Sequence, residues 1–307
     1  MKKLLLIFFV VSGLNFLAHV QLFAQHLAND QYTYQLQGNN PAYAGAWNML
    51  GITATGKSQL IGGAFGTSVY DLSIHSPLVN EKNGVGLYLY NYHYGPVNHF
   101  DANADYAYKI SLGSSESLRL GLRAKFTNYM LSNVQYVGNN NGTDVLGAYD
   151  NLNILGLGLG AFYVSSNLYI GLAMPQIKPL SISSDGTILF ANVIQFDGGY
   201  QFAFNEILDF IPSINARYQS VDDYAVNLNT DFLIYNKIWL GGSWQFGTSS
   251  VLGAKLNFKI NNQLMVGYAL EHFTEGFLSA YRYNNHKLVL SYAIKLNKKR
   301  IMSPRFF

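Results

Sequence analysis

Hydrophobic and polar residues alternate with a period of two along most of the chain, which is the pattern of β-strands that have two different faces. Residues 118–127 show it most clearly, because leucine, alanine and phenylalanine occupy the even positions. The odd positions include Arg119, Arg123 and Lys125, so three cations share one face of a single strand. The same alternation recurs at residues 100–110, 226–234, 252–260 and 287–295.

Fourteen segments of about ten residues carry this pattern, and that is the length with which a tilted strand crosses an outer membrane. The expected strands are residues 46–56, 68–76, 84–94, 98–111, 117–131, 153–164, 168–175, 191–204, 209–218, 224–235, 237–246, 250–260, 263–272 and 287–296. The long connections all follow odd-numbered strands and lie at residues 57–67, 132–152, 176–190 and 273–286. Bacterial outer-membrane barrels have even strand numbers, short periplasmic turns and longer external loops. The sequence therefore predicts an all-β fold, a transmembrane antiparallel up-and-down β-barrel of about 14 strands, with twelve or sixteen as alternatives.

The composition favours a membrane barrel over a soluble β-sandwich, which would also alternate. Charged residues make up only 12% of the chain and hydrophobic residues 49%, whereas an average soluble domain carries roughly 25% charged residues. After the first two dozen positions no apolar run reaches the ~18 residues that a transmembrane helix requires. In a membrane barrel the apolar face of each strand meets lipid and the polar face lines the lumen.

The first two dozen residues have the three parts of a secretory signal peptide. Lys2 and Lys3 precede an apolar stretch, and Ala24 is a small residue at the expected cleavage point. A transmembrane anchor is the alternative, but polar residues such as Asn15 interrupt the apolar run. We expect four parts, namely a cleaved signal peptide at residues 1–24, a periplasmic lead-in segment at 25–45, the outer-membrane barrel at 46–296 and a periplasmic C-terminal tail at 297–307.

Charge and aromatic residues refine this picture. Removal of Lys2 and Lys3 brings the net charge close to zero, so a basic surface for nucleic acid is not predicted. Tyr and Phe cluster near predicted strand ends, where rings at the headgroup level form girdles around outer-membrane barrels. The expected girdle residues include Tyr88, Tyr90, Tyr92, Tyr94, Tyr200, Phe202 and Phe204.

The chain has no cysteine and none of the common nucleotide or metalloprotease motifs. Gly156, Gly158 and Gly160 alternate within a strand pattern, so we expect them to face the lumen rather than to cradle a phosphate. His93 and His99 flank a predicted turn without a carboxylate cluster, and we interpret them as solvated turn histidines rather than metal ligands. No cofactor is expected.

Asp71, Ser73 and His75 share one face of a predicted strand, and an acid, a hydroxyl and an imidazole can support acyl transfer. Same-face neighbours in one strand are ~6.6–7 Å apart, so a direct hydrogen bond from Ser73 to His75 requires both side chains to lean together. No oxyanion-hole donor can be named either. We therefore expect polar lumen positions and a protein that is not an enzyme, with an outer-membrane hydrolase as an alternative.

The predicted lumen face carries charges of both signs, which favours an internal network of ion pairs over a one-sign selectivity ring. The sequence is consistent with a plugged lumen and with a small water-filled pore. The lumen-facing set comprises Asp101, Asp105, Lys109, Arg119, Arg123, Lys125, Asp197, Arg217, Asp231, Lys255, Lys259 and Glu271.

Several strings resemble the motifs of one known family, in the expected order. They are the motif Asn40, Pro41, Ala42, Tyr43, Ala44, Gly45 (NPAYAG), LSIHSPL at 72–78, NGVGL at 83–87, LRLGLRAKF at 118–126, KLVLSY at 287–292 and the ending SPRFF. Together they are similar to the PorP/SprF family of type IX secretion system membrane proteins of Bacteroidota, over essentially all of the expected mature chain. The resemblance implies an outer-membrane β-barrel that works with other type IX components. It also implies a role in gliding motility or in the secretion or anchoring of a cell-surface protein, an adhesin-like cargo with a type B C-terminal domain.

The segment before the first strand and the external loops are the parts that the barrel alone does not explain. Pro41 fixes φ and Gly45 permits an unusual turn, so we expect a rigid lead-in on the periplasmic side. Aromatic and arginine residues are common interface anchors, so loop 273–286 and the Asn- and Gly-rich loop 132–152 are candidates for cargo contact. The alternative is that these loops only cap the barrel, and a passive pore or transporter is the alternative function. The candidate contact residues are Phe277, Tyr281, Arg282 and Tyr283.

Overall fold

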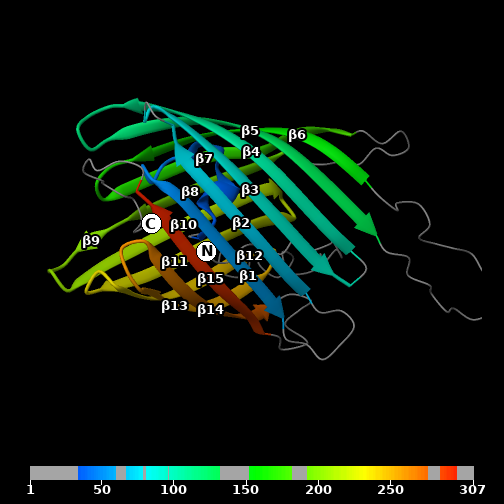
Figure 1. Ribbon diagram of the computed structural model, residues 1–307. Helices are drawn as coiled ribbons and strands as arrows, with labels where there is room; N and C mark the ends of the chain where they lie inside the picture. Colours follow the sequence, from blue (N-terminus) through cyan, green and yellow to red (C-terminus); the bar gives the residue numbers. More distant parts are fainter. Residues whose placement is uncertain are drawn as a thin grey trace, which may run out of the picture.

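The computed structural model describes residues 34–59, 67–78, 81–95, 97–131, 152–181, 192–275 and 284–295. Fifteen strands form one sheet around two short helical turns (Figure 1). The helical turns are α2 (Leu36–Asn39) and η2 (Pro41–Tyr43). The strands are β1 (Leu50–Gln59), β2 (Thr67–Pro77), β3 (Asn83–Tyr94), β4 (Val97–Ser111), β5 (Ser117–Leu131), β6 (Leu152–Val164), β7 (Leu168–Ser181), β8 (Val193–Tyr200), β9 (Phe202–Ala203), β10 (Leu208–Ser220), β11 (Asp223–Ile234), β12 (Ile238–Gly247), β13 (Ser250–Lys259), β14 (Leu264–Glu275) and β15 (Asn284–Ile294).

Each strand pairs antiparallel with its sequence neighbour, and the sheet closes on itself because β1 also pairs with β15. β8 and β9 both pair with β10, so they are one strand interrupted at Gln201, and the barrel has fourteen strands in this sense. Closure leaves no unpaired sheet edge, which a lipid environment requires. The predicted fold class and strand number are confirmed. Within the described residues, no helix is long and apolar enough to cross a membrane.

The two faces of the barrel have opposite character, as the alternation predicts. Leu122 and Leu157 on the outer face are 64% and 63% exposed, whereas Arg119 on the inner face is 1% exposed. Outward side chains are mainly Leu, Phe, Tyr and Ile, and inward ones mainly Asn, Ser, Thr, Asp, Lys and Arg. The apolar face therefore meets lipid and the polar face is enclosed.

Several boundaries differ from the predicted ones for local reasons. β7 continues to Ser181, although the predicted strand ended at Pro175, because a register shift between Ala173 and Gln176 accommodates the proline. β1 begins at Leu50 because Asn48, with a φ of 53°, turns the preceding chain. The predicted long connections lie largely outside the described residues, and the connections after β2, β4, β6, β9, β11 and β13 are short.

Residues 34–49, which we call the lumen segment, lie inside the barrel (Figure 1). Its helical turn η2 packs against the inner faces of β4, β5 and β6. We expected residues 25–45 to precede a barrel that starts at residue 46, but residues 34–45 are enclosed by the barrel and Ala46 to Met49 still belong to the segment. Alternation identifies the strands and cannot show that a non-strand segment folds back into their lumen. The lumen segment is followed directly by β1, so its last residues lie at the end of the barrel where β1 begins.

The apolar core of the protein is the packing of this segment against the barrel wall. Leu36, Ala42, Tyr43, Trp47 and Met49 form one buried cluster together with strand residues Phe162, Tyr169 and Ala293. The aromatic girdle prediction is correct in part, since Tyr200, Phe202 and Phe204 are exposed on the outside. Tyr88 instead points inward and is 7% exposed. It pairs with Ser73 in the sheet, and Ser73 lies on the inner face of β2.

Candidate functional site

The NPAYAG motif forms a compact turn that starts with a side-chain cap. Asn40 Oδ1 accepts a hydrogen bond from Ala42 N at 2.9 Å, and Pro41 occupies the first position of η2, where its missing N–H costs nothing. Gly45 follows with a φ of 73°, a backbone conformation that residues with a Cβ rarely adopt. Asn40 Nδ2 also donates to the carbonyl oxygen of Ala161 on β6 at 2.9 Å. The motif is therefore a rigid shape fixed to the barrel wall.

Glycines on the inner faces of the neighbouring strands make room for this turn. A Cβ at Gly121 would overlap the backbone of Pro41 and Ala42, and a Cβ at Gly84 would overlap the backbone of Ala44. A Cβ at Gly160 would overlap the Asn40 side chain. The prediction that the β6 glycines face the lumen agrees with their position, and Gly160 is the one of them that makes room for the lumen segment. A Cβ at Gly158 would instead overlap the backbone of Pro175 on β7.

Two arginines of β5 hold the backbone of the lumen segment. Arg119 donates from Nη1 to Ala44 O at 3.1 Å and from Nη2 to Gly45 O at 2.8 Å. Arg123 donates to the carbonyl oxygens of Gln37, at 2.5 Å, and of Gly38, at 2.6 Å. Buried carbonyl groups need partners, and guanidinium groups supply several donors in a fixed plane. Two of the three cations on this strand face are thus an anchor for one segment.

The neighbouring strand β4 supplies acidic partners for Arg123 and Lys125 of β5. Arg123 Nε lies 2.7 Å from Asp105 Oδ1, and the two side chains are 2% and 0% exposed. Lys125 Nζ lies 2.9 Å from Asp101 Oδ2 and donates to Gln176 Oε1 at 3.0 Å. Buried charges persist when they are paired and hydrogen-bonded, which both carboxylates satisfy.

The polar face of β2 contacts the lumen segment and does not form a catalytic triad. Asp71 accepts hydrogen bonds from Gln35 Nε2 and from Thr55 Oγ1. Ser73 Oγ donates to Gln37 Oε1 at 2.5 Å. None of the hydrogen bonds among the described residues joins Ser73 to His75, and the Ser73 hydroxyl is bound to the lumen segment instead.

His75 and His99 are buried and contact neighbouring side chains. The ring of His75 makes edge contacts with Tyr43 and Trp47, at centroid distances of 5.4 and 4.9 Å. His99 is buried, hydrogen-bonds Asp101 Oδ1 through Nε2 at 2.9 Å and stacks on a tyrosine ring, so it is not the solvated turn residue that we expected. His93 is exposed. The part of the chain that the structure describes contains no group of three or more metal-ligating side chains.

The opposite wall of the lumen, formed by β11 to β15 and β1, carries a second charged network. Lys255 Nζ lies 2.7 Å from Asp231 Oδ2, and Lys57 Nζ lies 2.8 Å from Glu271 Oε2. Tyr34 reaches this wall and donates to Asn257 Oδ1 at 2.5 Å, with the Lys255 ammonium 5.6 Å from its ring centroid. Burial raises the pKa of the Tyr34 hydroxyl, which therefore stays protonated and donates.

Four further residues that were predicted to face the lumen lie outside these two networks of ion pairs. Asp197 is fully buried and accepts from Asn215 Nδ2 at 2.7 Å. Arg217 pairs with Asp223 at the β10–β11 hairpin. Lys109 is only partly buried near the end of β4, and the ion pairs found among the described residues do not include it. Lys259 lies at the end of β13 beside a cavity.

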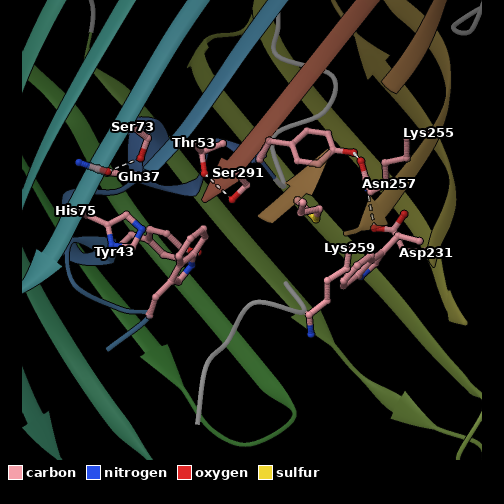
Figure 2. A pocket seen from close by; sticks show the side chains of 14 residues that line it. Gln37, Tyr43, Thr53, Ser73, His75, Asp231, Lys255, Asn257, Lys259 and Ser291 are labelled. Atoms are coloured by element: carbon pink, nitrogen blue, oxygen red, sulfur yellow. Dashed lines mark hydrogen bonds and ion pairs between the residues drawn. The ribbon is translucent and has the colours of Figure 1, made fainter. Parts of the chain in front are cut away.

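This cavity, of about 80 Å³, lies between the lumen segment and the β11–β15 wall. Figure 2 shows Gln37, Ser73 and His75 on one side of it and the β11 and β13 side chains on the other. Its volume exceeds the roughly 10–15 Å³ that one water molecule needs. The lining is completed by Tyr34, Tyr43, Trp47, Thr53, Asp231, Trp239, Lys255, Asn257, Lys259, Met265 and Ser291.

The family model described as "Type IX secretion system membrane protein PorP/SprF" matches residues 22–292. The chain belongs to this family. The match spans the lumen segment and the described strands up to residue 292 in β15, so the resemblance seen in the sequence is confirmed. With the barrel fold, it makes the protein an outer-membrane protein of the PorP/SprF family. The comparison with curated proteins gave no match.

Solved structures of outer-membrane barrels and channels resemble the fold. The deltaS2 mutant of the TodX monoaromatic hydrocarbon channel is 13% identical, covers 84% of this chain and 93% of its own, and has a TM-score of 0.51. CymD, another monoaromatic hydrocarbon channel, is 12% identical over 89% and 94% of the two chains, with a TM-score of 0.48. Omp33 of Acinetobacter baumannii is 10% identical over 81% and 100%, with a TM-score of 0.47. At 13% identity, the likeness to the TodX mutant shows the fold alone.

The sequence did not reveal that this PorP/SprF barrel is filled by its own N-terminal segment. Tyr34, Gln35 and Gln37, which touch three parts of the wall, carry no motif of their own. The available signal was the pairing of inward glycines on β3, β5 and β6 with a conformationally rigid NPAYAG turn. Phe277, Tyr281, Arg282 and Tyr283 lie outside the described residues, so their contact role stays a prediction.

Proposed function

We propose that the protein is a non-enzymatic outer-membrane barrel of the type IX secretion system that helps to secrete or anchor a cell-surface protein. The family match over residues 22–292 supports the secretion role. The observation that carries the geometric part is the lumen segment, which is bound by hydrogen bonds to two arginines and packed against glycines. A lumen filled in this way favours contact with a partner over conduction.

The proposed cargo is an adhesin-like protein with a type B C-terminal domain, held at the external end of the barrel. The connections at 132–151 and 276–283 both leave the barrel at the end opposite β1's first residue, which is the external end when the short turns are periplasmic. The second connection contains Phe277, Tyr281, Arg282 and Tyr283, and aromatic and arginine side chains are frequent interface anchors. These two connections are therefore the proposed cargo contacts.

Loop replacement in cells that depend on this protein tests the proposal. Residues 276–283 are replaced by a Gly-Ser linker of equal length, which leaves the β14–β15 pairing at His272–Asn284 intact. We expect cell-surface cargo to fall, as measured by labelling of intact cells, while barrel levels stay unchanged. The same replacement at residues 60–66, between β1 and β2, is the control. Normal surface cargo after replacement of both 132–151 and 276–283 would contradict the placement of the contact.

A passive pore is the alternative function, and conductance measurements distinguish it from the proposed function. The purified protein in planar bilayers is expected to show no steady channel, because the lumen segment occupies the interior. Large, long-lived open channels in the unmodified protein would instead support a pore or transporter.

A further inference from the structure

The cavity between the lumen segment and the β11–β15 wall lies toward the end of the barrel at which β1 begins. Lys259 is the last residue of β13, Met265 is the second residue of β14, and the register places Met265 opposite both Lys259 and Ser291. All three line the cavity. Short turns join the strands at this end, which is therefore the periplasmic end. The cavity is thus next to the periplasm.

The walls of the cavity combine aromatic surface with uncharged hydrogen-bonding groups, the Lys255–Asp231 ion pair and Lys259. Trp47 of the lumen segment and Trp239 of β12 contribute indole rings, and Met265 contributes a thioether. Trp239 belongs to a buried cluster with Ile211 and Leu233, so this wall is rigid. Sites that hold a small organic group are typically apolar, with a few polar groups that fix its orientation.

Positive charge gathers at the periplasmic mouth of this cavity. Lys237 is exposed in the β11–β12 turn, and its carbonyl oxygen accepts a hydrogen bond of 2.8 Å from Lys259 N, so the two residues are neighbours. Lys295 is exposed just after β15, at the same end. The acidic group inside the cavity, Asp231, is paired with Lys255. Two acidic residues lie at the same end of the neighbouring strands: Asp209 on β10, which accepts a hydrogen bond from Gln201, and the exposed Glu206 in the β9–β10 turn.

We propose that this cavity binds the end of an extended polypeptide from a periplasmic partner, with an aromatic side chain in the cavity and a carboxylate at the Lys259 rim. The size of the cavity suits one side chain rather than a folded domain. Charge complementarity selects a carboxylate over an amine at a mouth with Lys237, Lys259 and Lys295. This contact lies at the opposite end from the cargo contact proposed above and does not depend on it.

Titration calorimetry of the full-length protein in detergent micelles tests the proposal. The probe is acetyl-Gly-Gly-Phe with a free carboxylate, compared with its C-terminal amide and with acetyl-Gly-Gly-Ala. We expect the free acid to bind roughly tenfold more tightly than the amide, the factor for one charge-assisted hydrogen bond. The alanine peptide is expected to bind still more weakly than the acid, because it leaves the cavity empty.

Two variants locate the binding. Lys259→Gln is expected to remove the preference for the acid, and Met265→Trp is expected to abolish binding by filling the cavity. Lys82→Gln, on the β2–β3 turn of the same rim, is the control and should leave affinity unchanged. Equal affinity for acid and amide, or binding that survives Met265→Trp, would overturn the proposal.

The chain's own tail, residues 296–307, also contains aromatic residues and follows Lys295 at the same end. Binding of the probe that appears only after removal of residues 296–307 would make the tail the occupant and overturn the role of a partner. Binding of equal strength with and without the tail supports the proposal. Because these experiments use the isolated barrel, their failure would leave the secretion assay in cells unaffected.

Discussion

Arg119 Nη2 donates a hydrogen bond of 2.8 Å to the carbonyl oxygen of Gly45, and this bond fastens the lumen segment to the barrel wall. A second bond joins Arg119 to Ala44 O. Arg119→Met removes both donors, so that Gly45 O keeps only its bond of 3.3 Å from Asn48 N. Hydrogen bonds to charged groups contribute about 1.5–3 kcal/mol each. We expect a lower thermal unfolding midpoint and transient channel openings in planar bilayers.

Arg217→Met is the matched control for this prediction. Arg217 pairs with Asp223 at the β10–β11 hairpin and donates to Gln219 Oε1, so its contacts within the described part of the chain lie away from residues 34–49. Its replacement should leave the bilayer silent. Channel activity that is equal in the two variants would show that the segment is not what closes the lumen.

Gly121 tests the close approach of the segment to β5. A Cβ at this position would overlap the backbone of Ala42, which cannot move aside as a flexible side chain can. Gly121→Ala should therefore displace the NPAYAG turn and destabilise the barrel. Gly156→Ala, on the adjacent strand β6, meets its nearest atom at 3.8 Å and should be neutral. Heat-modifiable migration in gels measures both, and similar stability of the two variants would contradict the packing.

The Asp105–Arg123 ion pair is expected to contribute far more to stability than the partly exposed Arg217–Asp223 pair at the β10–β11 hairpin. Asp105 and Arg123 are almost fully buried, so removing one partner leaves an uncompensated charge, at a cost of about 3–5 kcal/mol. Asp105→Asn should lower the free energy of unfolding by this amount in urea titrations. Asp223→Asn, whose partner pair is partly exposed, should cost at most about 1 kcal/mol.

Ser73→Ala tests whether the β2 face has a catalytic role. Ser73 donates to Gln37 Oε1, so its loss should cost about 1 kcal/mol of stability and leave cargo at the cell surface unchanged. Gln37→Ala removes the other partner of this bond and serves as the comparison. A loss of cargo export after Ser73→Ala, with normal barrel levels and normal export after Gln37→Ala, would revive the hydrolase alternative.

The barrel was predictable because the alternation is local. The inner and outer faces of β5 follow directly from the odd and even positions of residues 118–127, and the register of a hairpin with a short turn, such as β4–β5, follows from that turn. Local rules failed where the chain departs from regular strands. Pro175 concealed the second half of β7, and the interior position of Tyr88 could not be separated from a place in the girdle.

By itself, the sequence determined the strands, the polarity of each face and the family, since these depend on residue spacing and short motifs. Only the tertiary structure decided what the inward charges do. The sequence places Arg119 and Arg123 on one face of a strand. Their partners, Gly45 and Gln37, lie more than seventy positions away along the chain. Closure of the barrel brings those groups together, and no pattern within a single segment encodes a contact that exists only after the sheet has closed around the lumen segment.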